Sequence, residues 1–388
     1  MHYNTIMNQL QDFVPRHHFD TLVKSYFGER YVKSFTCWNQ FTTMLYAQVS
    51  GKDSLRDIQN SLTAQSHKLY HLGLQSVKRS TLADANQTRD YHIYEKLFYR
   101  IYERCENIVP KSRFKFKNPL LIIDATTIDL CLSMFDWAKF RTTKGAIKLH
   151  CQFEHSEQIP SFITVTDGKT HEITAARSFF NPVADSIYCV DKGYSDYSWL
   201  YTIDESKAFF VTRAKDNIKY EVIGQHSEPK KESVISDDII AFTGFYQKQD
   251  YPKELRLIHY YDKETDKTFM FLTNNFNLSA STIAKIYKAR WQIEVFFKWI
   301  KQNLKIKTFL GTSKNAVLTQ VWIAMCYYLL LSYIKYQSKY KNTIQYLHKI
   351  IKTTVLERLN LIDLLNMNDK ILSRVIPKQH LGQLTFNF

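Results

Sequence analysis

The spacing of apolar residues changes along the chain. Up to about residue 115, apolar side chains recur at helical spacing, as in FTTMLYAQVS and YHIYEKLFYRIYERC, which favours helices. From Asn118 and Pro119 onward, short apolar or β-branched runs are separated by polar turns, as in PLLIIDATTIDLCLS, AIKLHCQF and IPSFITVTDG. Runs of this kind are typical of neighbouring strands. We therefore expect a helical N-terminal unit followed by a sheet.

The middle of the chain alternates between helix and strand signals. HEITAARSFF predicts a short helix, SIYCV a strand, and the residues up to AFFVTRA a second helix followed by a strand. From about Ile218 to Asn275 the pattern predicts strands only, with no helical window between YEVIGQ, DIIAFTGFY, ELRLIHYYD and TFMFLTN. Alternation of this kind indicates a mixed α/β layer, here with a β-rich insertion.

A helical region is expected after the insertion. Ser279 is a good N-cap, and helical periodicity continues from it to about Leu372. The apolar run from Val321 to Ile334 has 14 residues, fewer than the roughly 20 that a membrane-spanning helix needs. We interpret this run as a buried helix and expect no membrane association.

These patterns predict an α/β protein in five parts. They are a helical N-terminal domain (1–115), the first part of an α/β core (116–217), the β-rich insertion (218–276), a core helix (277–330) and a basic helical C-terminal region (331–388). The N-terminal stretch MHYNTIMNQLQDFVPRHHFD lacks the apolar segment of a secretory signal. We therefore expect a cytoplasmic protein.

Charge gives the first indication of a partner. The chain has 52 Lys and Arg residues against 37 Asp and Glu, a formal charge of +15 and a pI of about 9.3. A polyanion is the expected partner, with nucleic acid ahead of a membrane surface. The six cysteines are scattered without a CxxC pair, which argues against a zinc knuckle and a disulfide framework and predicts reduced, mostly buried thiols.

Two aspartates follow apolar runs. Asp124 comes directly after LLII and Asp191 directly after IYCV, so each carboxylate is expected at the end of a buried strand. A single charge is costly there, whereas a metal ligand suits the position. The competing interpretation is that each aspartate caps the turn that follows it.

A third carboxylate lies in the stretch YKARWQIEVFFKWIKQNLK. At about 100° per residue, one helical stripe contains Tyr287, Arg290, Glu294, Lys298 and Lys301. An apolar face adjoins this stripe and would hold the helix to a core.

Cations exceed acids around Glu294. From residue 285 to residue 314 there are eight basic residues and one acidic residue. The basic residues are Lys285, Lys288, Arg290, Lys298, Lys301, Lys305, Lys307 and Lys314. An i, i+4 salt bridge of Glu294 is a common and weak alternative that cannot neutralise so many cations. The excess favours a carboxylate that holds a divalent metal among cations that hold phosphates.

The three carboxylates Asp124, Asp191 and Glu294 can together bind two Mg²⁺ or Mn²⁺ ions, because these hard cations prefer oxygen ligands. Two such ions, about 3.5–4 Å apart, promote in-line attack on a phosphodiester. Other motifs are weaker: His67 and His71 lack the glutamate of a zincin, and SGKDS lacks the upstream glycine of a phosphate loop. We expect phosphoryl transfer on DNA or RNA without a nucleotide cofactor.

The spacing of the residues in the stripe is specific. Tyr287, Arg290, Glu294 and Lys301 follow the pattern Y-x2-R-x3-E-x6-K. This pattern resembles the YREK signature of bacterial insertion-sequence transposases of the DDE class, in the IS-four-like group.

Three further segments agree with this resemblance. IIDATTIDL around Asp124 resembles the first-aspartate motif of that family, and VDKGYSD around Asp191 resembles the second. KGAIKLH, residues 144–150, resembles the strand that follows the first aspartate. The resemblance covers about residues 121–307.

The resemblance implies an RNase H-like core in which Asp124, Asp191 and Glu294 form a metal-binding triad. It also implies that Tyr287, Arg290 and Lys301 grip phosphates near the transposon end. From the excess of basic residues, Lys298 and Lys305 are expected to bind DNA as well. The partners would be double-stranded DNA, as transposon ends and target, and a second copy of the chain in a synaptic complex. Such a protein would work at the bacterial nucleoid.

Relatives that cut the second strand through a DNA hairpin often use a Trp of the insertion to stack on a flipped base. No Trp occurs between Trp199 and Trp291, and the candidates that remain are Phe245, Tyr246, Tyr260 and Tyr261. Residues 77–91 have the character either of a DNA-facing helix or of a solvated one. The run 335–352, with five lysines and no acid, either contacts phosphates or is a solvated face.

Three functions are consistent with the sequence. The first is a transposase that cleaves at terminal inverted repeats and joins the free 3′-hydroxyls to target DNA. The second is a nuclease on the same fold that cuts without joining. The third is a catalytically silent DNA-binding repressor, which the presence of all three carboxylates disfavours.

Overall fold

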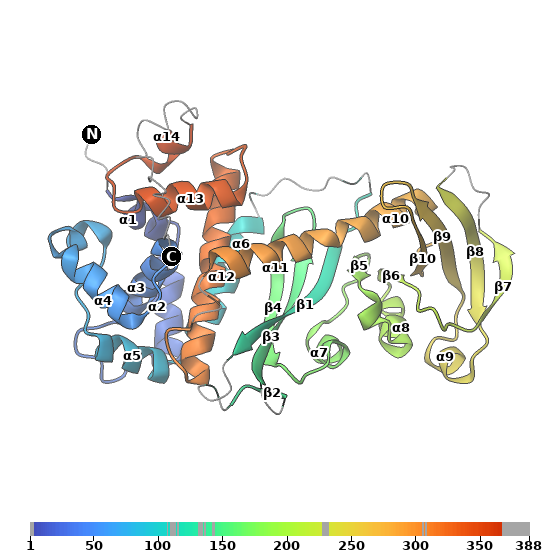
Figure 1. The fold of residues 1–388 in the computed structure, drawn as a ribbon, viewed down its shortest axis with the longest axis horizontal. Helices are drawn as coiled ribbons and strands as arrows, with labels where there is room; N and C mark the ends of the chain where they lie inside the picture. Colours follow the sequence, from blue (N-terminus) through green and yellow to red (C-terminus); the bar gives the residue numbers. More distant parts are fainter. Residues whose placement is uncertain are drawn as a thin grey trace, which may run out of the picture. The chain divides into compact units, whose positions relative to one another are not determined.

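The computed structural model describes residues 4–106, 108, 114, 116–130, 135, 137–141, 144–226, 233–304, 306 and 309–366 (Figure 1). The chain forms two compact units. One contains Met1–Val109 and Trp299–Phe388, and the other contains Pro110–Lys298. The N-terminal helices thus share a unit with helices from the C-terminal part of the chain.

The first unit is helical, as the apolar spacing predicts. Its helices are α1 (Ile6–Asp12), α2 (Arg16–Ser25), α3 (Cys37–Ser50), α4 (Leu55–Ala64), a 3₁₀ helix (Ser66–Leu72), α5 (Arg79–Thr88), α6 (His92–Glu106), α12 (Lys314–Gln337), α13 (Ile344–Thr354) and α14 (Leu361–Asn366). Helix α12 packs against α3, α5, α6 and α13.

The apolar run at residues 321–334 lies inside α12 and is buried, as expected. The length argument does not hold, however, because the helix extends beyond the run on both sides. The whole helix has 24 residues, and among the described helices it alone is long and apolar enough, by length and composition, to cross a membrane. Its most apolar window is 94% buried inside the protein. A helix that is apolar on all sides and covered by other helices is a core helix.

The second unit is a mixed sheet with helices. Its first half contains β1 (Leu120–Leu130), β2 (Lys139–Arg141), β3 (Lys144–Glu154), β4 (Ile159–Asp167), α7 (Glu172–Phe179), β5 (Ile187–Val190), a 3₁₀ turn (Lys192–Tyr194), α8 (Tyr197–Glu205) and β6 (Phe209–Arg213). Its second half contains β7 (Tyr220–Gln225), β8 (Val234–Phe242), α9 (Phe245–Asp250), β9 (Leu255–Asp262), β10 (Lys267–Thr273) and α10 (Ala280–Ala289). Helix α11 (Trp291–Asn303) begins in this unit and ends in the first.

Strands β4, β3, β1, β5 and β6 are neighbours in that order. The pairs β4–β3 and β3–β1 are antiparallel, whereas β1–β5 and β5–β6 are parallel. Strand β1 lies in the centre because its first four residues, LLII, are buried on both faces. This order is that of the RNase H-like core that the family resemblance implies.

The β-rich insertion extends the same sheet. Strand β10 pairs antiparallel with β6, and β9, β8 and β7 follow outward (Figure 1). One apolar cluster includes Ile123 of β1, Phe210 of β6, and Leu257 and Leu272 of the insertion. The prediction of strands only is wrong at one place, because the six-residue helix α9 separates β8 from β9. None of the residues of this helix, FYQKQD, is buried. Its sequence therefore lacks the apolar periodicity by which a helix is predicted.

A buried ion pair connects the insertion to the helix that follows. Arg256 of β9 donates from Nε to Asp237 Oδ1 of β8 at 2.7 Å, and the two side chains are at most 1% exposed. The same guanidinium donates from Nη1 to the backbone carbonyl oxygen of Asn275 at 3.0 Å. Ser279 then caps α10 by accepting from the N–H of Thr282, so the predicted N-cap is confirmed.

Five of the six cysteines lie in the described part of the chain, and all five are free and buried: Cys37, Cys105, Cys151, Cys189 and Cys326. This agrees with the expected reduced thiols, while Cys131 lies outside the described residues.

Candidate active site

Asp124 lies on β1, and Asp191 directly follows the adjacent parallel strand β5. The parallel register of β1 and β5 pairs Ile123 with Val190, and each aspartate is the next residue of its chain segment. Asp191 follows the end of β5, as expected. The expectation that Asp124 ends its strand is wrong, because β1 continues to Leu130 along the antiparallel partner β3.

The stretch that carries Glu294 consists of two helices and not one. Helix α10 ends at Ala289 and α11 begins at Trp291. Between them, the N–H of Arg290 donates to the carbonyl oxygen of Tyr287 at 3.1 Å, a three-residue spacing that tightens the chain. The single regular stripe predicted from residue 287 to residue 301 is therefore interrupted at Arg290.

The apolar faces of α10 and α11 pack against the sheet and thereby determine where the polar side chains of these helices lie. Ile286 of α10 and Ile293 of α11 are fully buried, and α10 packs against β5, β6 and β8. The ring of Phe296 lies 5.3 Å from the ring of Phe153 on β3. These contacts hold Tyr287 and Glu294 near the strands that carry the two aspartates.

Arg290 joins two of the three carboxylates. Its Nη1 atom lies 3.2 Å from Asp124 Oδ2, and its Nη2 atom lies 2.6 Å from Glu294 Oε1. The Arg290 and Asp124 side chains are only 15% and 18% exposed. A single guanidinium therefore lies between carboxylates that come from a strand and from a helix.

Asp191 has other direct partners. The hydroxyl of Tyr287 donates to Asp191 Oδ1 at 3.0 Å, and Arg213 Nη2 lies 3.5 Å from the same oxygen. The Tyr287 ring lies 5.7 Å from the Arg213 guanidinium carbon and 5.8 Å from that of Arg290. Tyr287 thus lies among the groups that surround Asp191.

The pKa values of the two aspartates are shifted in opposite directions. Burial raises the pKa of the Asp124 carboxyl to about 6, with help from the negative charges of Asp191 and Glu172, although Arg290 opposes the rise. Burial also acts to raise the pKa of Asp191, but the backbone N–H of Lys192, Arg290, Tyr287 and Arg213 outweigh it and lower that pKa.

Sequence reasoning missed three charged residues near the site. Arg213 ends β6 beside Asp191. Glu172 opens α7, acts on the charge of Asp124, and lies 3.5 Å from Lys148 Nζ through its Oε1 atom. Lys148 lies within KGAIKLH, the segment that resembles the strand after the first aspartate, and this resemblance could have pointed to it. Arg213 ends a buried strand, as Asp191 does, and the same search applied to basic residues would have found it.

The remaining predicted cations lie along α11. Lys298 is exposed, and Lys301 is in the last turn, beyond the point where the chain passes into the helical unit. Lys305 lies outside the described residues.

The donor set fits divalent metal ions. Its groups are carboxylate oxygens, the ligands that Mg²⁺ and Mn²⁺ prefer, and Asp124 and Glu294 already share one cationic group. Within the described residues, no three His, Cys, Asp or Glu side chains form a ready-made metal cage. The guanidinium of Arg290 separates the carboxylates instead.

Comparison with known proteins identifies the family. Residues 115–330 match the family model described as "Transposase DDE domain", and residues 2–75 match a domain of unknown function, DUF4372. A protein of Sinorhizobium fredii named as a transposase, y4zB, is 33% identical over 64% of this chain and 69% of its own length. A "Probable transposase for insertion sequence element IS5377" of Geobacillus stearothermophilus is 29% identical over 69% of this chain and 70% of its own length.

Among solved structures, a cryo-EM structure of a piggyBac transposase synaptic complex with hairpin DNA resembles this chain with a TM-score of 0.46 and 10% identity. The similarity covers 89% of this chain and 77% of that one.

The chain belongs to the transposase DDE domain family. It is an enzyme that cuts and transfers DNA strands, and enzymes of this family normally use divalent metal ions.

Proposed function

We propose that this chain is the transposase of an insertion sequence, which cleaves DNA at the terminal inverted repeats of its element and joins the 3′-hydroxyl ends to target DNA. One observation carries the assignment of its site. Asp124 on β1 and Glu294 on α11 meet at one guanidinium, and Asp191 follows the adjacent parallel strand. The three residues are the proposed catalytic triad.

Asp124, Asp191 and Glu294 would hold two Mg²⁺ or Mn²⁺ ions. When bound, the ions supply Lewis acidity, which activates a water or a 3′-hydroxyl and stabilises the oxygen that leaves the phosphodiester. Arg290 gives up its carboxylate partners in that state, and its guanidinium can then pair with a DNA phosphate. A planar guanidinium suits both partners, because carboxylate and phosphate each accept two parallel hydrogen bonds from it.

Other residues of the chain bind the DNA backbone in this proposal. Arg213 is 34% exposed beside Asp191, so it can neutralise a phosphate next to the reacting one. Tyr287 orients Asp191 through its hydroxyl. Lys298, Lys301 and Lys305 follow in the sequence and are proposed to bind phosphates as well.

Roles for the other regions are part of the same proposal. The N-terminal helices bind the transposon end, the basic C-terminal region adds phosphate contacts, and two copies of the chain pair the two ends in a synaptic complex at the nucleoid. For a hairpin route, Phe245 and Tyr246 are the best candidates to stack on a base, since they open α9 and are 78% and 76% exposed.

The test uses the purified full-length chain, Mg²⁺ or Mn²⁺, a plasmid that carries both ends of the element, and a second plasmid as target. We expect cleavage at the element ends and covalent joining of those ends to the target, with neither reaction in EDTA. Cleavage without joining would support a nuclease. Specific binding of the ends without cleavage in either metal would support a repressor.

A further inference from the structure

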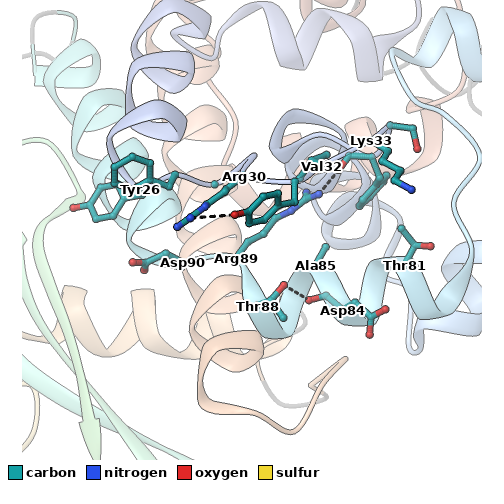
Figure 2. A pocket seen from close by; sticks show the side chains of 15 residues that line it. Tyr26, Arg30, Val32, Lys33, Thr81, Asp84, Ala85, Thr88, Arg89 and Asp90 are labelled. Carbon is teal, nitrogen blue, oxygen red and sulfur yellow. Dashed lines mark hydrogen bonds between the residues drawn. The ribbon is translucent and has the colours of Figure 1, made fainter.

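The helical unit contains a cavity of about 560 Å³ between the segment after α2 and helix α5 (Figure 2). Arg30, Lys33 and Arg89 line it together with Asp84 and Asp90, so its charges nearly balance and indicate no particular partner. The α/β unit contains a group of polar side chains with more specific chemistry, beside the carboxylates of the candidate active site.

Glu172 is the first of these side chains. It opens α7, which packs against the 3₁₀ turn that follows Asp191. Its Oε1 atom lies 3.5 Å from Lys148 Nζ, and the same lysine donates to the carbonyl oxygen of Thr170 at 2.9 Å. The Lys148 side chain is only 13% exposed, whereas that of Glu172 is 40% exposed. The carboxylate is therefore held by a nearly buried cation but remains accessible to ions from solvent.

A glycine keeps the other carboxylate oxygen of Glu172 uncovered. Gly193, two residues after Asp191, does not have the left-handed backbone that would require glycine. A Cβ atom at this position would lie 3.5 Å from Glu172 Oε2, and no other described atom outside its chain neighbours would lie within 4 Å. A larger side chain at residue 193 would thus cover Glu172, which lies over the turn after the second aspartate.

Tyr194 supplies a polar atom without a partner. Its side chain is 1% exposed and lies in one apolar cluster with Ile123 and Val190. Its hydroxyl has no hydrogen-bond partner among the described residues. Burial raises the pKa of this hydroxyl, and the negative charges of Asp124 and Glu172 raise it further, so the hydroxyl lies near both carboxylates. A buried donor without a partner is costly, and at this position it can donate to a carboxylate that binds an ion.

The charge of Glu172 also acts on Asp124. Together with the charge of Asp191, it helps burial to raise the pKa of the Asp124 carboxyl. Arg290 joins Asp124 to Glu294, and Lys148 pairs with Glu172. No ion pair of the described residues joins Asp124 to Glu172. Two carboxylates that repel each other without a shared cation suit a divalent ion, which would supply one.

We propose that Glu172 is a fourth carboxylate of the active site and binds a divalent ion together with Asp124. Lys148 holds Glu172 in place in the metal-free chain, and Tyr194 donates its hydroxyl to a carboxylate that binds the ion. This inference rests on the proposed function, which assigns metal ions to Asp124, and it goes beyond the three carboxylates of that assignment.

The test measures Mn²⁺ binding by the full-length chain without DNA, in a calorimetric titration, so that the readout does not depend on catalysis. Glu172→Gln removes the charge, whereas Glu172→Asp keeps the charge and shortens the side chain. The control is Glu205→Gln, which removes the same charge from a glutamate of the same unit that also pairs with a lysine, Lys253. Asp124→Asn reports on the proposed metal site itself. Thermal melting in EDTA checks that each variant is folded, and Glu172→Ala replaces Glu172→Gln if the latter is not.

We expect Glu172→Gln to bind Mn²⁺ at least about tenfold more weakly than the wild type. We expect Glu172→Asp to bind it more weakly as well, because a shorter ligand does not reach the ion, and the control to bind it as the wild type does. Wild-type affinity in Glu172→Gln would overturn the inference. Wild-type affinity in Glu172→Asp would also overturn it, because the charge would then act only from a distance.

The Asp124→Asn variant separates this inference from the proposed function. If Asp124→Asn loses Mn²⁺ affinity while the Glu172 variants keep it, the fourth carboxylate alone is wrong. If the wild type binds no Mn²⁺, or if Asp124→Asn binds it as tightly as the wild type does, the metal site of the proposed function fails as well.

Discussion

The Nη1 atom of Arg290 lies 3.2 Å from Oδ2 of Asp124, although 166 residues separate them in sequence. The same guanidinium reaches Glu294. A cation is therefore held between two of the carboxylates that the proposed mechanism assigns to divalent ions. Arg290 and a metal ion cannot both keep these partners, so the two should compete.

This competition predicts the behaviour of Arg290→Ala. Without metal, the variant should be less stable than the wild type by about 1–3 kcal/mol, because two partly buried carboxylates lose their partner. Its affinity for Mn²⁺ should rise by about tenfold, since no guanidinium has to be displaced. Thermal melting in EDTA and calorimetric Mn²⁺ titration check the two effects. The control Arg177→Ala removes an exposed pair with Asp196 and should leave the stability and the Mn²⁺ affinity nearly unchanged. If Arg290→Ala binds Mn²⁺ no more tightly than the wild type, competition is excluded.

The pKa of Asp124 predicts a pH dependence of stability. Its folded value is about 6, above the ordinary 3.8, so the folded protein binds this proton more tightly than the unfolded chain does. The stabilising contribution is complete below pH 3.8 and is lost as the pH rises through 6. Relative to Asp124→Asn, the metal-free wild type should thus lose on the order of 3 kcal/mol between pH 4 and pH 8. Denaturant unfolding of both proteins in EDTA measures this difference, and parallel pH curves would contradict the prediction.

The hydroxyl of Tyr287 is predicted to tune Asp191. Tyr287→Phe keeps the ring beside Arg213 but removes the hydrogen bond that helps to lower the pKa of Asp191. The acid limb that Asp191 contributes to the pH–rate profile should move to higher pH, so cleavage should slow more near pH 4 than near pH 7. Tyr261→Phe, on the insertion, is the matched control. Equal profiles for wild type and Tyr287→Phe would show that the hydroxyl has no such role.

The buried pair of Arg256 and Asp237 predicts a large effect on stability. Asp237→Asn leaves an uncompensated guanidinium in the core and should destabilise the protein by about 3–5 kcal/mol. Lys253→Ala removes a cation that is 49% exposed, from its pairs with Asp204 and Glu205, and should cost less than about 1 kcal/mol. Urea unfolding measures both. A small loss for Asp237→Asn would mean that water reaches this pair in solution.

The sheet of the core could be predicted because its strands are marked locally. LLII before Asp124 and IYCV before Asp191 are apolar enough to specify buried strands without knowledge of their neighbours. The N-cap at Ser279 was equally clear, because capping depends on a side chain and a backbone N–H three residues apart.

Other features depend on contacts that periodicity does not encode. The pairing of β10 with β6 joins the insertion to the core sheet, and nothing in either strand specifies its partner. The break at Arg290 occurs within good helix formers, where the ion pairs to Asp124 and Glu294 are the tertiary contacts at the joint. Arg213 ends an apolar strand that the sequence marks, but its position beside Asp191 depends on the pairing of β6 with β5.

The central claim is that Glu294 is a catalytic carboxylate of a DNA-cleaving and DNA-joining enzyme. The most direct measurement compares the wild type, Glu294→Gln and Glu264→Gln, an exposed control in the same unit, in cleavage of the element ends with Mg²⁺. We predict that Glu294→Gln binds the end duplexes as the wild type does but cleaves them at least about 100-fold more slowly, while the control cleaves normally. If Glu294→Gln cleaves and joins as fast as the wild type, the assigned active site is wrong.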